Sequence, residues 1–213
     1  MVEKLIIPKP KIILPHASAN DWDFNSSRWQ IQTTHYVSPP SALQIGTITA
    51  LVELHSLCKN AAVLILPQGR IVKWVRLANA QRYVYFNFRN TAPPGTSNNE
   101  NGYFVTFRLS ELTWALVERV NGTNKRVWER PKPAYEANTW YRFRLSWWMS
   151  WDLMIVTLER KINEEWVKQG DIISIENPLY GDAQYQRPGV GGQGGAGGNE
   201  VYIDDTEIWA YIP

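Results

Sequence analysis

The chain has 213 residues, 44% of them hydrophobic, and its 22 basic side chains nearly balance its 20 acidic ones. This composition excludes an intrinsically disordered chain, and the net charge of +2 argues against a nucleic-acid-binding domain, which is usually strongly basic. The single cysteine, Cys58, excludes an internal disulfide and a multi-cysteine zinc site. Tryptophan occurs 11 times, which supplies large flat rings for a core and for a binding surface.

Residues 1–20 carry Pro8, Pro10 and Pro15 and are expected to form an extended N-terminal arm. The apolar runs of the arm are too short for a membrane span, and they lack the small-residue cleavage pattern of a secretory signal. We therefore expect no membrane span and no signal peptide. The chain is then intracellular, has lost a leader, or leaves the cell by another route such as on a virus particle. An extracellular or virion-associated location is favoured.

After the arm, apolar and polar residues alternate with a period of two, which predicts β-strands. The clearest segments are RIVKWVRLA (70–78), RYVYFNFRN (82–90), GYFVTFRL (102–109), TWYRFRLSWW (139–148), DLMIVTLER (152–160) and NEVYIDDTEIWAYIP (199–213). Segment 110–120 has helix-forming residues, but the Asn121-Gly122 that follows favours a strand and a hairpin. Residues 43–60 are expected to be helical in part, and the glycine-rich run 189–198 is expected to be a surface loop.

The number of short strands and the absence of a strand–helix alternation decide the fold class. About a dozen strands joined by polar turns predict an all-β, two-sheet antiparallel β-sandwich of the jelly-roll kind. No domain linker interrupts the chain, so residues 21–213 are expected to form one domain.

The last predicted strand carries two adjacent carboxylates, Asp204 and Asp205, in its middle. Because successive side chains of a strand point to opposite faces, one of them must face the packed side, where an uncompensated charge is costly. A structural metal, a basic partner or a catalytic role could each neutralise that charge.

Four segments together resemble the concanavalin A-like and laminin-G-like group of glycan-recognising jelly-roll domains. They are DWDFNSSRWQ (21–30), NGYFVTFRLSELTWALVERVNG (101–122), ANTWYRFRLSWW (137–148) and VYIDDTEIW (201–209), which cover about half of the chain. In that group, the first segment is similar to an opening strand and the last to the closing strand. The resemblance implies a concanavalin A-like sandwich.

The resemblance also implies a place for calcium, because the closing-strand aspartate in this group often holds a structural calcium with oxygens of the opening strand. Neighbouring first and last strands would bring Asp21, Asp23 and Asn25 towards Asp204 or Asp205, and calcium prefers such oxygen ligands. The alternative is that one aspartate pairs with an arginine or caps backbone N–H groups of an adjoining loop, while the other is solvated.

The concanavalin A-like fold also hosts glucanases and polysaccharide lyases, so their catalytic patterns are expected in an enzyme. The glucanases carry paired carboxylates on a central strand, whereas Asp205 and Glu207 share a face of the closing strand. The lyases need a tyrosine and a histidine, and His16, His35 and His55 lack the family's surroundings. We therefore assign no catalytic residue; if the chain is an enzyme, we expect a glycoside hydrolase or polysaccharide lyase.

Aromatic side chains placed away from the core are the candidates for ligand contacts, because their rings stack on sugars while amides and arginines bond the hydroxyls. Trp147 and Trp148 must point to opposite faces, and Trp151 lies in a turn. The predicted ligand-binding residues are Trp148, Trp151, Tyr83, Tyr85, Asn87, Arg89 and Tyr103. An exposed aromatic patch also suits a protein partner, and the resemblance favours a glycan.

The function predicted from these observations is a non-catalytic, carbohydrate-binding (lectin-like) domain whose partner is a polysaccharide or glycan. The alternative is a structural or attachment protein of a virion or another assembly, in which the arm 1–20 reaches a neighbouring subunit or a virion partner. The charged stretches ERK (159–161) and NEE (163–165) are also typical of a thermophilic source.

Overall fold

The computed structural model describes fifteen parts of the chain. They are residues 7–8, 12–14, 22–24, 29–37, 42–45, 54–58, 68–78, 83–90, 101–108, 113–131, 136–148, 153–176, 178, 187–193 and 201–212. Every regular element in these parts is a β-strand, and none of them contains a helix long and apolar enough to cross a membrane.

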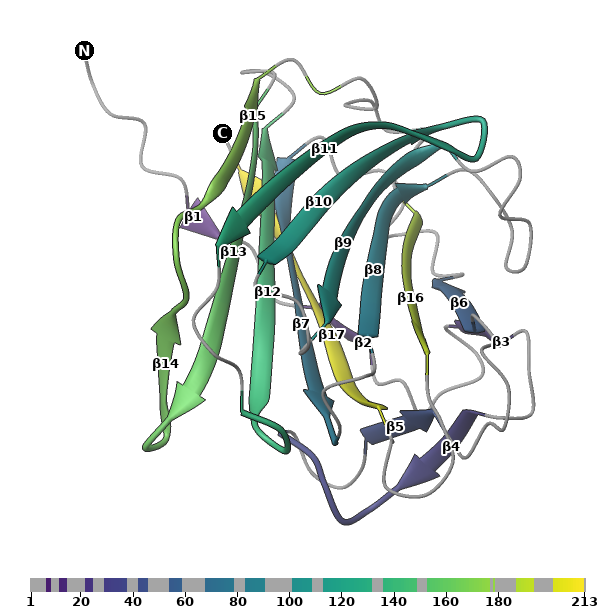
Figure 1. Ribbon diagram of the computed structural model, residues 1–213, viewed down its shortest axis with the longest axis vertical. Coiled ribbons are helices and arrows are strands. Elements are labelled where there is room, and N and C mark those ends of the chain that lie inside the picture. Colours follow the sequence, from purple (N-terminus) through teal and green to yellow (C-terminus); the bar gives the residue numbers. More distant parts are fainter. Residues whose placement is uncertain are drawn as a thin grey trace.

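The described strands form two sheets, which we call the back sheet and the front sheet (Figure 1). The ten strands of the back sheet run in the order β14 (Glu165–Lys168), β13 (Leu153–Ile162), β12 (Trp140–Trp148), β7 (Gln68–Leu77), β17 (Val201–Ile212), β5 (Ala42–Ile45) and β4 (Trp29–Gln32), with β1 (Ile7–Pro8) and β2 (Ile12–Leu14) on β17 and β15 (Ile173–Glu176) on β13. The seven strands of the front sheet run in the order β11 (Thr123–Pro131), β10 (Thr113–Val120), β9 (Gly102–Arg108), β8 (Tyr83–Asn90), β16 (Arg187–Gln193), β6 (Leu54–Cys58) and β3 (Trp22–Phe24).

All described strand pairs are antiparallel, which confirms the predicted two-sheet antiparallel β-sandwich. The hairpin predicted at Asn121-Gly122 joins β10 to β11. Asn121 and Gly122 have φ angles of 49° and 73°, and two such residues form the turn whose twist matches that of the flanking strands.

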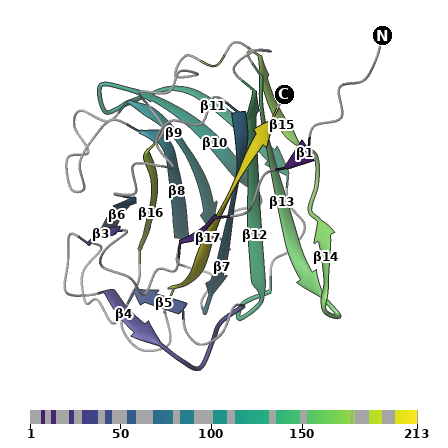
Figure 2. The same ribbon diagram turned by 180° about the vertical axis from the view of Figure 1, so that it is seen from behind.

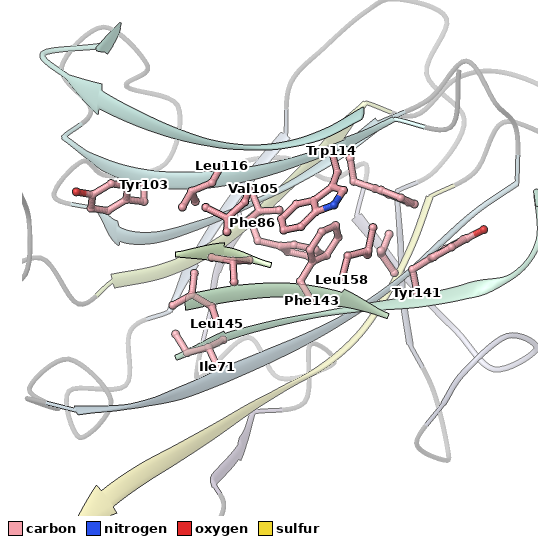
Figure 3. Close-up of a cluster of buried hydrophobic side chains, with 14 of the residues drawn as sticks. Ile71, Phe86, Tyr103, Val105, Trp114, Leu116, Tyr141, Phe143, Leu145 and Leu158 are labelled. Atoms are coloured by element: carbon pink, nitrogen blue, oxygen red, sulfur yellow. The ribbon is translucent and has the colours of Figure 1, made fainter. Parts of the chain in front are cut away.

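The core lies between the two sheets and is rich in aromatic side chains (Figure 3). Phe143 of β12 points from the back sheet and meets two rings of the front sheet, with ring centroids 5.3 Å from Phe86 and 5.5 Å from Phe107. The predicted alternation is confirmed on β12, since Tyr141, Phe143, Leu145 and Trp147 are all buried. Edge-to-face ring pairs of this kind stabilise a core beyond the area that they bury.

Two charged side chains, those of Lys73 and Glu118, lie inside the sandwich and make hydrogen bonds there. Lys73 is 2% exposed, and its Nζ donates a hydrogen bond of 2.5 Å to Thr206 Oγ1. Glu118 is 1% exposed, and its carboxylate accepts hydrogen bonds from Tyr103 Oη at 2.7 Å and from Arg126 Nε at 2.9 Å. The bond to Glu118 raises the pKa of Arg126. Hydrogen-bonded pairs remove most of the cost of burying such groups.

The expectation of a surface loop at 189–198 is wrong for the residues that the structure describes. Residues 189–193 belong to strand β16, because β8 and β6 supply hydrogen-bonding partners on both sides. Long-range pairing overrides local preference here. Within 43–60, residues 43–45 and 54–58 are strands, and the remaining residues lie outside the described part, so a partial helix there stays a prediction.

Two described stretches of the predicted arm are strands of the back sheet. β1 and β2 both pair with β17 of the same chain (Figure 2). The arm is therefore joined to the sandwich at these two places, and its reach to another subunit stays a prediction.

Gly69 of β7 provides a test of the packing of the back sheet. A Cβ atom at this position would contact the carbonyl oxygen of Trp209 and would lie 3.1 Å from Trp147 Cζ2. Since neither a backbone carbonyl nor a buried ring yields easily, Gly69→Ala is expected to lower the free energy of unfolding by about 1–3 kcal/mol. Urea denaturation measures this change.

Val167→Ala on the edge strand β14 is the matched control. Val167 is 40% exposed, so its truncation should change the free energy of unfolding by no more than about 0.5 kcal/mol. A Gly69→Ala variant as stable as the wild type would contradict the packing described here.

Candidate functional site

Strand β8 lies in the middle of the front sheet and carries four of the predicted ligand-binding residues. Phe86 of this strand is 4% exposed and packs in the core. Tyr83, Tyr85, Asn87 and Arg89 occupy the alternate positions, as predicted, and their side chains lie outside the described part of the structure. Across the ladder, Tyr85 pairs with Thr106 and Asn87 pairs with Phe104.

Glycines border these positions on the other side. Gly191 of β16 pairs with Tyr85, and Gly189 pairs with Asn87. A glycine offers no side chain, so a strip of the sheet beside Tyr85 and Asn87 is backbone alone. Glycine inside a strand often marks a place where a ligand or another backbone approaches closely.

Phe104 and Arg119 form a pair on the same outward face that the sequence analysis missed. Phe104 is half-buried, and the guanidinium of Arg119 lies 4.9 Å from the centroid of its ring. Arg119 Nε also donates to Asn124 Oδ1 at 3.1 Å, which fixes the guanidinium. The alternation in GYFVTFRL could have identified Phe104, since it stands between the core residues Tyr103 and Val105.

Tyr103 itself lies in the core and not on the surface. It is 1% exposed, and its hydroxyl donates to the buried carboxylate of Glu118. The expectation that Tyr103 presents a ring to a ligand is corrected by this placement, because its parity matches that of Val105 and Phe107, which are also buried.

Trp148 lies on the other sheet, so the structure does not bring it together with Tyr83 and Tyr85. Trp147 is 2% exposed and packs in the core, whereas Trp148 at the end of β12 is half-buried. This confirms that the two tryptophans point to opposite faces of their strand. Trp151 lies outside the described residues.

A β-bulge accommodates the adjacent aspartates of β17. Ile203 pairs with Val75 and Thr206 pairs with Lys73, so β17 has one residue more than β7 between these two pairs. Asp204 is 1% exposed, and its Oδ2 accepts a hydrogen bond from the backbone N–H of Val37. The side chain of Asp205 lies outside the described part.

The loop that donates to Asp204 is held in shape by its own residues. Gln32 Oε1 accepts the backbone N–H groups of Thr34 and His35, each at 2.8 Å. The His35 ring packs edge-on against Tyr202, with ring centroids 5.0 Å apart. Asp204 thus anchors a folded loop, which corresponds to the capping alternative drawn from the sequence.

Asp23 and Asp204 do not lie on the neighbouring strands that the expected calcium site requires. Asp23 lies in β3, which pairs with β6 at the edge of the front sheet, whereas Asp204 lies in the back sheet. Asp21 and Asn25 lie outside the described residues. Among the described residues, no group of three or more His, Cys, Asp or Glu side chains could hold a metal ion. The side chains of Asp23 and Asp205 also lie outside the described part, so the calcium site stays a prediction.

Comparisons with known proteins bear on the fold. No protein-family model matches the chain, and no curated protein matches its sequence. Solved structures do match it. A legume lectin-like domain from Entamoeba histolytica shares 12% identity at a TM-score of 0.63, with 90% of each chain covered.

Two further structures agree with this match. The exoplasmic/lumenal domain of VIP36, in a Ca²⁺/Man3GlcNAc-bound form, shares 10% identity at a TM-score of 0.60, with 92% of this chain and 89% of that one covered. Peanut lectin shares 10% identity at a TM-score of 0.57, with 96% and 100% covered. At such identities a likeness concerns the fold. The chain therefore has the legume lectin-like, concanavalin A-like β-sandwich fold that its sequence motifs predict.

Proposed function

We propose that this chain is a non-catalytic, lectin-like domain that binds glycans on the outward face of its front sheet. The observation that carries the proposal is the combination of the legume lectin-like fold with the order of strands on this face. There, β8 with Tyr83, Tyr85 and Asn87 runs between the glycine strand β16 and β9. The VIP36 domain, which has a similar fold, was solved with a glycan.

The chemistry of this face suits a sugar. An aromatic ring stacks on the apolar side of a pyranose, and amide or guanidinium groups bond its hydroxyls. Phe104 with its overlying Arg119 and the Thr106 position supply such groups on β9 and β10. The glycines of β16 let a flat ligand approach the backbone closely.

The first test of the proposal is a glycan array, followed by calorimetry with the best sugar. Tyr85→Ala and Asn87→Ala should each weaken binding about tenfold, since tenfold corresponds to ~1.4 kcal/mol and one aromatic contact contributes that order. Tyr103→Phe is the matched control, because it changes a buried tyrosine on the neighbouring strand. It should lower stability by about 1 kcal/mol and leave the affinity unchanged.

If the protein is shown to be folded and binds no sugar on the array, the glycan proposal is overturned. An unchanged affinity of both β8 variants would remove the front face from the site. Loss of binding in Tyr103→Phe without loss of fold would place the ligand elsewhere.

A second experiment concerns calcium, which the family resemblance implies. Because Asp204 anchors the loop through Val37, Asp204→Ala is expected to lower the free energy of unfolding by about 1–3 kcal/mol. The loss should be the same with added calcium and with a chelator. Thermal melting under both conditions measures it.

Asp171→Ala, at an exposed position, is the control and should melt like the wild type. A calcium-dependent rise in the melting temperature of the wild type that disappears in Asp204→Ala would instead assign Asp204 to a metal site.

A further inference from the structure

The outward face of the back sheet carries a second concentration of aromatic and basic side chains. Its strands β12, β14, β7 and β17 present half-buried tryptophans and arginines between their core-facing residues. These are Arg70, Trp140, Arg142, Arg144, Trp148, Trp166 and Trp209. Tryptophan and arginine are enriched where proteins bind partners, and this face lies on the opposite sheet from the proposed glycan site.

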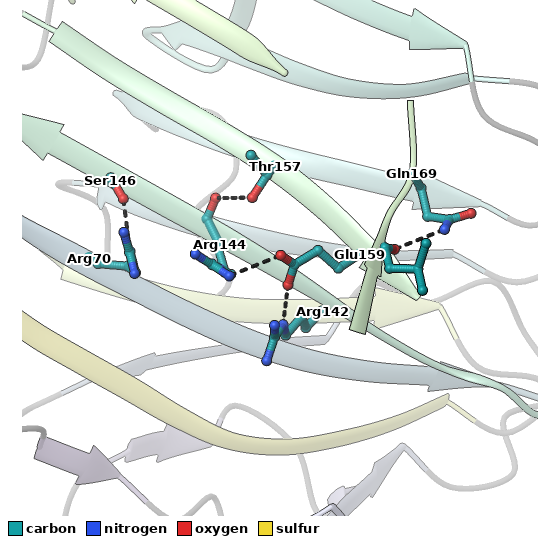
Figure 4. Close-up of polar contacts among 8 residues, drawn as sticks. Arg70, Arg142, Arg144, Ser146, Thr157, Glu159 and Gln169 are labelled. Atoms are coloured by element: carbon teal, nitrogen blue, oxygen red, sulfur yellow. Dashed lines mark hydrogen bonds and ion pairs between the residues drawn. The ribbon is translucent and has the colours of Figure 1, made fainter. Parts of the chain in front are cut away.

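Three residues of this face form a cluster of ion pairs (Figure 4). Arg142 and Arg144 are two positions apart on β12, and Glu159 lies directly across from Arg142 on β13. Arg142 Nε donates to Glu159 Oε2, and Arg144 Nη1 donates to Glu159 Oε1 at 2.9 Å. One carboxylate therefore holds two guanidiniums, and the cluster keeps a net charge of one positive unit.

The cluster positions its guanidiniums without using up their donors. Two arginines carry about ten N–H donors, and among the described residues their side-chain hydrogen bonds go only to Glu159. The Glu159 side chain is 11% exposed, whereas those of Arg142 and Arg144 are 19% and 33% exposed. The Glu159 side chain is therefore the most buried of the three, and both arginine side chains are partly exposed.

An aromatic ring fixes the cluster further. The guanidinium of Arg142 lies 4.5 Å from the ring centroid of Trp166 on β14, a cation–π contact that helps to hold it in place. A planar fork held in place loses little entropy when it binds a carboxylate or a sulfate with two hydrogen bonds.

A third arginine of this face, Arg70, lies on the neighbouring strand β7. Ser146, two positions beyond Arg144, accepts a hydrogen bond of 3.1 Å from Arg70 Nε of β7. Trp209 pairs with Arg70 on the next strand. Alternate residues of a strand are about 6–7 Å apart, so the outward positions of β12 place Arg142 and Arg144 in line between Trp140 and Trp148. A line of this kind suits a linear polymer better than a single small anion.

We propose that the Arg142–Glu159–Arg144 cluster binds acid groups of a linear anionic polysaccharide, whose sugar rings lie on the neighbouring tryptophans. The two guanidiniums are complementary in charge to acid groups, and tryptophans stand at both ends of their row on β12. Carboxylates of uronic acids and sulfate esters share the chemistry that the guanidiniums recognise. The site is separate from the front sheet, so it stands or fails independently of the glycan proposed there.

The test measures affinity of the full chain for polygalacturonate, for dextran sulfate and for neutral dextran, at low and high salt. The wild type should bind at least one of the two anionic polymers and not dextran, and the affinity should fall as salt rises. Binding to polygalacturonate alone assigns a carboxylate ligand, and binding to dextran sulfate alone assigns a sulfate ligand. Equal retention on dextran, or no binding to either anionic polymer, would overturn the proposal.

The variants are chosen so that no buried charge is left alone. Arg142→Gln/Arg144→Gln/Glu159→Gln removes two positive charges and one negative charge together, and should weaken binding at least tenfold. Lys125→Gln on the exposed strand β11 makes the same change in net charge on the other sheet, and should stay within about twofold of the wild type. An equal loss in both variants would mean that net charge alone determines binding, which contradicts the proposal.

Arg144→Gln keeps the Arg142–Glu159 pair and tests the site even if the triple variant does not fold. It should weaken binding several-fold with an unchanged melting temperature. Light scattering provides the last check. A wild type that is dimeric, does not bind the polymers and becomes monomeric in Arg144→Gln would show that the face contacts a second copy of the chain, and would overturn the proposal.

Discussion

The packing of one face of each sheet against the other is the constraint on which the rest of this structure depends. Phe143 of the back sheet meets Phe86 and Phe107 of the front sheet, and these contacts fix which residues of three central strands turn inward. Because a shift of one residue would move every side chain of a strand to the opposite face, the register is fixed together with the core. The residues that remain outward are then set for both sheets, and both candidate sites are built from them.

Polar residues at inward positions show how strictly this constraint acts. Lys73 is accommodated by Thr206 across the strand pair, and Glu118 is accommodated by Tyr103 and Arg126. The register of β17 against β7 shifts at the bulge between Ile203 and Thr206, and this shift turns Thr206 to the inward side. The two adjacent aspartates are thus compatible with a packed sheet, and the first of them is used to hold a loop.

Much of this arrangement is predictable from the sequence because alternation reports burial directly. The segment 139–148 divides correctly into inward and outward residues, and Asn121-Gly122 identifies its hairpin because few residues adopt positive φ at both positions. Strand β16 escapes prediction because glycines carry no hydrophobic pattern, and its stability comes from partners that are distant in the sequence. The edge position of β3, with Asp23, likewise depends on pairing with β6, which no local pattern discloses.

The same distinction between local pattern and long-range pairing decides which site residues can be predicted from the sequence. Positions such as Tyr85 and Asn87 follow from alternation, whereas the pairing of Arg142 with Glu159 across β12 and β13 depends on a register that only the folded sheet defines. A list of residue types gives three charged residues there. The fold turns them into one cluster, in which a mostly buried glutamate side chain pairs with two partly exposed arginine side chains.

The two outward faces differ in chemistry although they share one core. The front face combines ring and amide positions with bare glycine backbone, which suits hydroxyl-rich, uncharged ligands, whereas the back face places fixed guanidiniums beside rings, which suits acid groups. The packed interior separates the two faces. A substitution on one face should therefore change the free energy of binding on the other face by no more than about 0.3–0.5 kcal/mol. If both proposed sites bind their ligands, the two faces would hold two parts of one polysaccharide, or two different ones, independently of each other.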